Sequence, residues 1–138
     1  MLFTSDIKVA TLPGVGDPDP EPGTAVTVTG WGKELDDNNG VYPDQLMYSE
    51  APVVITNAEC EEVYGSLVIT ENEICIDSSN GGVCNGDSGG PLNWPQEDGS
   101  YIQIGVTSFV SGAGCESRDP HGFTRTSKYL DWIDTVTA

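Results

Sequence analysis

The chain has 138 residues and a formal net charge of −17, from 22 acidic and five basic side chains. This length suits one domain with a substantial core. The acidic balance argues against nucleic acid and anionic membranes as partners, because both would repel the chain. A basic partner could explain the charge, but we favour solubility in a salty medium, and no apolar run approaches membrane-spanning length.

The first third of the chain consists of loops around one predicted strand. Residues 8–12 form a short extended segment, and residues 13–23 alternate acidic residues with prolines, which is typical of a stiff surface loop. Residues 24–30 alternate apolar and polar side chains and predict a half-buried strand. Residues 36–40 (DDNNG) form a loop tip, and neither acidic segment has the ligand spacing of a calcium loop.

The middle of the chain predicts several short strands and one short helix. Residues 46–54 read as a strand interrupted by a proline. A helix over residues 60–64 begins at a cap, Thr56 or Asn57, and ends at Gly65. Further short strands are predicted for residues 73–76, 91–93, 101–110 and 122–126.

The C-terminal segment changes to a helical period. Its apolar residues recur at positions i, i+3, i+4 and i+7, namely Tyr129, Trp132, Ile133 and Val136. Thr126 or Ser127 would cap this helix. Short strands with frequent turns and one terminal helix predict an antiparallel barrel or sandwich.

Residues 84–92 have the sequence CNGDSGGPL, and a plain surface turn does not need this whole combination of residues. Glycine tolerates positive φ and has no Cβ, so backbone N–H groups can converge on one point, as an oxyanion hole requires. We therefore interpret Ser88 as a nucleophile, with the N–H groups of Gly86 and Ser88 as oxyanion donors. The string also fits the nucleophile elbow of α/β-hydrolases, but Pro91 follows and no helical period begins at Ser88, so we reject that reading.

Four cysteines allow three disulfide pairings, and the sequence alone does not choose among them. No Cys-x-x-Cys pair exists and the chain has one histidine, so we expect no metal and no cofactor. Disulfides indicate an oxidising compartment and a secreted protein. No signal peptide is visible at the N-terminus, so we expect that an upstream part is missing.

These segments, in this order and spacing, resemble the second half of the chymotrypsin-like serine proteases of the trypsin family, from about residue 9 to the C-terminus. The resemblance rests on GWG (30–32), APV (51–53), Cys60, Cys75, NGDSGGPL (85–92), GVTSF (105–109) and YLDWI (129–133). Within the family the chain looks most like the crustacean collagenase (brachyurin) and chymotrypsin group. The phrases that suggest this subgroup are ICIDS (74–78), LN (92–93) and FTR (123–125).

The resemblance implies an all-β fold, a six-stranded antiparallel Greek-key barrel that is the second of the family's two barrels. We expect this barrel over about residues 9–126 and a helix over about 127–137, in a partial peptidase domain from which the first barrel is absent. The resemblance also implies two disulfides, Cys60–Cys75 and Cys84–Cys115.

The resemblance further implies a serine endopeptidase that acts on protein or peptide substrates through acyl transfer by Ser88. Gly86 and Ser88 would supply the oxyanion donors. Asp87 matches the carboxylate that pairs with the ammonium freed by zymogen cleavage, and Ser108 matches the serine that supports the triad aspartate.

The family's specificity pocket can be placed on this sequence. Gly82 matches the pocket base and carries no charge, so cleavage after Lys or Arg is not expected. Val110 replaces a usual glycine and would narrow the mouth, while His121 would close the floor or bind a polar substrate group. We predict small or medium apolar residues before the cut, or acidic ones if His121 is protonated. The resemblance implies the following substrate-binding residues: Gly82, Val83, Asn85, Phe109, Val110, His121 and Gly122.

The mechanism also needs a histidine base and an aspartate, which in this family precede the region seen here. His121 would lie in the specificity pocket and not beside Ser88. We therefore expect a monomer that is inactive alone and needs the first barrel in cis. The alternatives are a non-catalytic homologue that acts as a binding or regulatory module, and a truncated product that does not fold alone.

Overall fold

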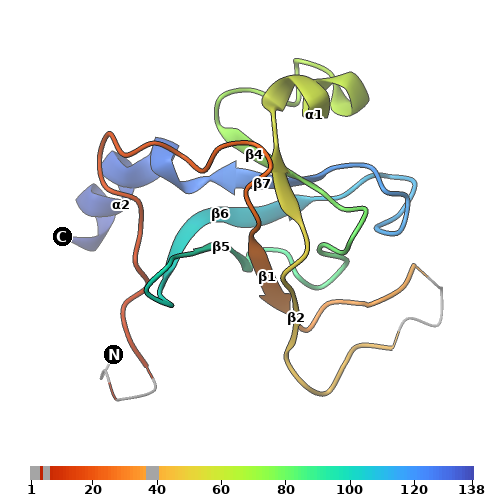
Figure 1. The fold of residues 1–138 in the computed structure, drawn as a ribbon, viewed down its shortest axis with the longest axis horizontal. Coiled ribbons are helices and arrows are strands. Elements are labelled where there is room, and N and C mark those ends of the chain that lie inside the picture. Colours follow the sequence, from red (N-terminus) through yellow and green to blue (C-terminus); the bar gives the residue numbers. More distant parts are fainter. Residues whose placement is uncertain (1–3, 5–6, 37–40) are drawn as a thin grey trace.

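Short strands and helical segments follow one another through residues 4, 7–36 and 41–138, the part of the chain described by a computed structural model (Figure 1). The strands are β1 (Thr27–Gly30), β2 (Met47–Ser49), β3 (Val53–Ile55), β4 (Glu73–Asp77), β5 (Pro91–Pro95), β6 (Tyr101–Phe109) and β7 (His121–Arg125). The helical segments are α1 (Asn57–Tyr64), the 3₁₀ turn η1 (Thr126–Tyr129) and α2 (Leu130–Thr137). Residues 37–40 of the predicted loop tip lie outside the described residues.

The strands form one antiparallel sheet in the order β2-β1-β5-β6-β7-β4-β3. Its ends meet because the segment before β1 pairs with β3, with Val26 N donating to Pro52 O at 3.0 Å and Val54 N to Thr24 O at 2.9 Å. The predicted strand over 46–54 is thus β2 and β3 in succession, separated by Pro52, which has no N–H. With β2 and β3 counted as one strand, the sheet is a six-stranded barrel, as predicted.

The alternation of β1 and its neighbours supplies the barrel core. Buried apolar side chains from six elements meet there, chiefly Val26, Val28, Val54, Ile74, Ile76, Leu92, Ile104 and Phe123. Each such side chain contributes about 1.5–3 kcal/mol when it leaves water. A second cluster joins Cys60 of α1 to Cys75 of β4 and to Ile69, and it contains the disulfide Cys60–Cys75.

Helix α1 begins with a capping box. Thr56 Oγ1 accepts from Glu59 N at 3.1 Å, and the Glu59 carboxylate accepts from Thr56 N at 2.8 Å. The side-chain hydrogen bond from Thr56 lowers the pKa of Glu59. Of the two predicted caps, Thr56 is therefore correct, and Gly65 ends the helix with φ at +80°.

The predicted cap of the C-terminal helix is wrong. Thr126 and Ser127 form the 3₁₀ turn η1, and α2 starts after Tyr129 without a side-chain cap. The chain passes directly from β7 into η1, and the side chain of Thr126 is buried, so its hydroxyl does not reach the helix N–H groups. The predicted apolar face is nevertheless present: Trp132 is 63% exposed, and no residue of α2 is buried among the described residues.

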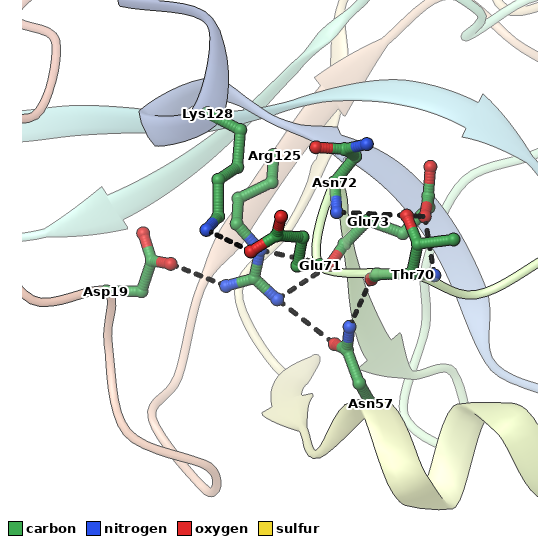
Figure 2. A network of polar contacts seen from close by, with 8 residues as sticks. All are labelled: Asp19, Asn57, Thr70, Glu71, Asn72, Glu73, Arg125 and Lys128. Atoms are coloured by element: carbon green, nitrogen blue, oxygen red, sulfur yellow. Dashed lines mark hydrogen bonds and ion pairs between the residues drawn. The ribbon is translucent and has the colours of Figure 1, made fainter. Parts of the chain in front are cut away.

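A polar network fastens the acidic N-terminal loop to the barrel (Figure 2). The Arg125 guanidinium donates to Asp19 Oδ2 at 2.5 Å, to Asn57 Oδ1 at 3.0 Å and to the carbonyl of Glu73. One side chain therefore joins the loop over residues 13–23, the start of α1 and β4 to the end of β7. No helix in the described part of the chain is long and apolar enough to cross a membrane.

Candidate active site

The loop over residues 84–90 is a pair of tight turns between the disulfide-bonded Cys84 and strand β5. Asp87 N donates to Cys84 O at 3.0 Å, and Gly90 N donates to Asp87 O at 2.8 Å. Gly86 has φ at +104° and Gly89 at +82°, which is the left-handed region that glycine adopts without strain. The glycines of this loop are therefore required by its backbone.

Three N–H groups of the loop, those of Asn85, Gly86 and Ser88, have no acceptor within the described residues. The N–H groups of Asp87, Gly89 and Gly90 all have acceptors. Lys33 N donates to Asn85 O at 2.9 Å, and this bond fixes the direction of the peptide that joins Asn85 to Gly86. Because the peptide is trans, the Gly86 N–H points away from Lys33.

Ser88 and Ser108 lie on neighbouring segments. Thr107 exchanges hydrogen bonds with the loop, accepting from Gly89 N at 3.0 Å and donating to Gly90 O at 2.8 Å. Both serines are exposed, and the Ser88 hydroxyl has no hydrogen-bond partner in the described part of the chain. A free hydroxyl beside two free N–H groups is an arrangement that can carry out nucleophilic attack and stabilise the oxyanion that forms.

Asp87 is turned away from solvent toward the backbone. Its carboxylate accepts from Gly32 N at 2.8 Å and from Cys84 N at 2.9 Å. A Cβ on Gly30 or Gly32 would collide with this carboxylate. The two glycines of the GWG segment therefore have a specific use: they leave room for Asp87.

A cleft of about 510 Å³ lies behind the loop. Of the residues predicted for the site, it brings together Asp87, Gly82, Val83 and His121, with Cys84 and Cys115 in its wall. Ser88, Phe109 and Val110 do not line it. The cleft therefore joins the predicted pocket base to Asp87 and not to the nucleophile.

His121 is the first residue of β7 and is 1% exposed. Its Nδ1 accepts from Val83 N at 3.0 Å, and its Nε2 has no hydrogen-bond partner within the described residues. Burial lowers the pKa of His121, against the raising effects of the Cys115 carbonyl and the Asp36 and Asp119 carboxylates. The neutral imidazole therefore prevails, which counts against the alternative of acidic substrates.

The imidazole of His121 occupies the space that the absent side chain of Gly82 leaves. A Cβ on Gly82 would lie 2.6 Å from His121 Cε1. The space next to Gly82 is therefore filled by the His121 ring.

Phe109 is the last residue of β6, and Val110 follows it. The Phe109 ring meets the Tyr64 ring edge to face, with centroids 5.1 Å apart, and it covers Gly122, where a Cβ would collide with it. Val110 is half-buried and packs against the barrel core. Both side chains are therefore partly engaged by the protein itself.

Sequence reasoning missed Tyr42 and Lys33. A Cβ on Gly86 would lie 2.9 Å from Tyr42 Cε1, so this ring covers one side of the predicted oxyanion donor. The Lys33 ammonium is 5.9 Å from the centroid of the Tyr42 ring. Both residues flank the loop over residues 36–40, and no sequence signal pairs them with the segment near Ser88.

The disulfide Cys84–Cys115 connects this loop to the segment before β7. Asp36 reinforces the same junction, because its carboxylate accepts from Cys115 N and Glu116 N, each at 2.8 Å. Both disulfide pairings that the resemblance implied are present, and all four cysteines are engaged in them.

Comparison with known proteins gives the family. A family model described as trypsin matches residues 2–133. Brachyurin of Leptuca pugilator is 42% identical, over 99% of this chain and 62% of the relative. Chymotrypsin-like elastase family member 3B of Homo sapiens is 40% identical, over 96% of this chain and 48% of the relative.

A solved structure of HL collagenase is 39% identical to this chain and superposes on it with a TM-score of 0.80. The match covers 99% of this chain and 56% of that chain. The chain thus spans about half the length of the relatives it matches. With a matching family model over most of its length and the barrel that the resemblance implied, the chain belongs to the trypsin family of serine proteases.

Proposed function

We propose that this chain is a partial peptidase domain, over residues 1–138, that carries the nucleophile of a serine endopeptidase. The observation that carries the proposal is the exposed hydroxyl of Ser88 beside the unpartnered N–H groups of Gly86 and Ser88. Ser88 Oγ attacks the substrate carbonyl, the two N–H groups stabilise the oxyanion, the amine leaves, and water then releases the acid.

The general base comes from another part of the molecule. The one histidine of the chain is buried, and its Nδ1 already accepts from Val83, so it does not take the proton of Ser88. A first barrel in cis would supply the histidine and aspartate, with Ser108 supporting that aspartate. The apolar face of α2 supports this placement, because it lines a groove of about 470 Å³ with Gln103, Val106, Thr124, Thr126, Tyr129, Trp132 and Ile133.

Asp87 would control activation. Its carboxylate lines the cleft of about 510 Å³ and accepts from backbone N–H groups. A freed α-ammonium in this cleft would pair with Asp87, and a partly buried carboxylate gains from such a partner. The same contact would hold the loop over residues 84–90 in its active form.

The pocket would select small or medium apolar residues before the cut. Gly82 gives a neutral base, and His121, whose Nδ1 accepts from Val83 N, fills the floor as a neutral imidazole. Asn85 would border the pocket, although it does not line the cleft of about 510 Å³. Phe109, Val110 and Gly122 would form its wall. The two disulfides support a secreted protein in an oxidising medium. We further propose that the protein acts as a monomer in digestion.

The test is a peptide-library assay on this chain joined to a first barrel that bears the histidine and aspartate. We expect cleavage after small or medium apolar residues, abolished by Ser88→Ala and retained by the exposed control Ser66→Ala. Cleavage only after Arg or Lys would refute the specificity, and full activity of Ser88→Ala would refute the nucleophile. Substrate binding without any hydrolysis would favour the non-catalytic homologue.

A further inference from the structure

We propose that Asn85 is a site of spontaneous modification, at which the side-chain amide is lost by attack of the Gly86 backbone nitrogen. The chain has three Asn-Gly pairs, at residues 39–40, 80–81 and 85–86. Glycine has no Cβ to hinder the approach of its nitrogen to the preceding side chain. The deprotonated Gly86 N bonds to Asn85 Cγ, ammonia leaves, and water opens the resulting succinimide to aspartate or isoaspartate.

Hydrogen bonding distinguishes the two Asn-Gly pairs within the described residues. Gly81 N donates to Ser78 O at 3.0 Å, so its proton and position are held. Gly86 N has no acceptor in the described part of the chain. Breaking a backbone hydrogen bond first would slow attack by a factor of about five. Asn85 should therefore react before Asn80 in the folded protein.

The surroundings of Asn85 also favour the reactive anion. The negative charge of a deprotonated amide spreads onto its carbonyl oxygen, and Asn85 O accepts from Lys33 N at 2.9 Å. The neighbouring carboxylate of Asp87 is directed to Gly32 N and Cys84 N. The Asn85 side chain is exposed and has no hydrogen-bond partner among the described residues, so it is free to turn toward Gly86.

The consequence for catalysis rests on the proposed function. In the succinimide Gly86 has no N–H, so one oxyanion donor is lost. Hydrolysis to aspartate restores the N–H but adds a negative charge next to the oxyanion, and isoaspartate lengthens the backbone before Ser88. Loss of one such donor lowers kcat by about 100-fold or more.

The test follows isoaspartate at both sites in the whole 138-residue chain. Folded and guanidinium-denatured samples are held at mildly alkaline pH, digested in acid, and mapped by mass spectrometry and by isoaspartate methyltransferase labelling. The denatured sample shows how the neighbouring residues alone affect the rate at each asparagine, so the comparison isolates the effect of the fold. We expect the ratio of modification at Asn85 to that at Asn80 to be about fivefold higher in the folded sample. An equal or lower ratio in the folded sample would overturn the proposal.

Two variants separate the chemistry from its effect on function. Asn85→Gln should abolish isoaspartate formation at residue 85, and Asn80→Gln should leave isoaspartate formation at residue 85 unchanged. In the chain joined to a first barrel, activity is followed on storage as a fraction of each protein's own starting activity. This fraction should fall in step with modification at Asn85 in the parent and in Asn80→Gln, and it should stay constant in Asn85→Gln. Modification at Asn85 without such decay would refute the effect on catalysis, and the mapping result does not depend on activity.

Discussion

Replacement of Asp87 by asparagine tests how the loop over residues 84–90 is held. The carboxylate accepts from Gly32 N and Cys84 N, and the space around it is closed because a Cβ on Gly30 or Gly32 would collide with it. Asparagine keeps one acceptor and turns an NH₂ group toward the other N–H. A hydrogen bond to a charged group contributes about 1.5–3 kcal/mol, so we expect Asp87→Asn to lower the unfolding free energy by about 2–3 kcal/mol.

Urea unfolding of the oxidised chain measures this change, with Asp98→Asn as the matched control. Asp98 also accepts two hydrogen bonds, from Ser100 N and Oγ, but it is exposed. Both variants remove one negative charge, so any relief of the overall charge cancels. We expect the control to unfold like the parent chain. Equal unfolding free energies for the two variants would refute the anchoring role of Asp87.

Four further changes probe the barrel and the site. Gly82→Ala places a Cβ 2.6 Å from His121 Cε1 and should cost about 1–3 kcal/mol in urea unfolding; an unchanged midpoint would contradict it. Replacing Cys60 and Cys75 by serine opens a loop with a sequence separation of 15 and should cost about 3 kcal/mol. Arg125→Lys provides fewer directed donors and should lower the unfolding free energy by about 1–3 kcal/mol. Urea unfolding measures the change for the cysteine variant and for Arg125→Lys, and an unaltered curve for either variant would contradict its prediction. Burial lowers the pKa of His121 from 6.5, so the unfolded chain binds the proton first and stability should fall as pH drops below 6.5; an imidazole NMR titration at or above 6.5 would contradict this.

Local patterns in the sequence predicted most of the fold. The alternation over residues 24–30 predicted a half-buried strand, which is β1 over Thr27–Gly30, and the apolar period near the C-terminus predicted α2. Thr56 was one of the two predicted caps of α1. Each depends on residues that are close in sequence. The cap at Thr126 failed because burial by distant strands takes its hydroxyl away from the helix.

The site was predicted only where a motif contains its own geometry. The glycines around Ser88 set the turns of that loop, and their catalytic role remains a prediction. The partners of Asp87, by contrast, come from 55 residues earlier as well as from within the loop, and Val83 N reaches His121 across 38 residues. No local pattern contains such long-range pairs. For the same reason, the sequence did not predict that the Tyr42 ring covers one side of Gly86.

The proposed function assigns this chain the nucleophile but not its base. A fluorescent phosphonate that labels activated serines tests it directly, with the labelled residue located by peptide mapping. We predict rapid labelling at Ser88 in the chain joined to a first barrel, none in Ser88→Ala, and little or none in the 138-residue chain alone. Rapid labelling of Ser88 in the chain alone, or none at Ser88 in the joined protein, would contradict the account.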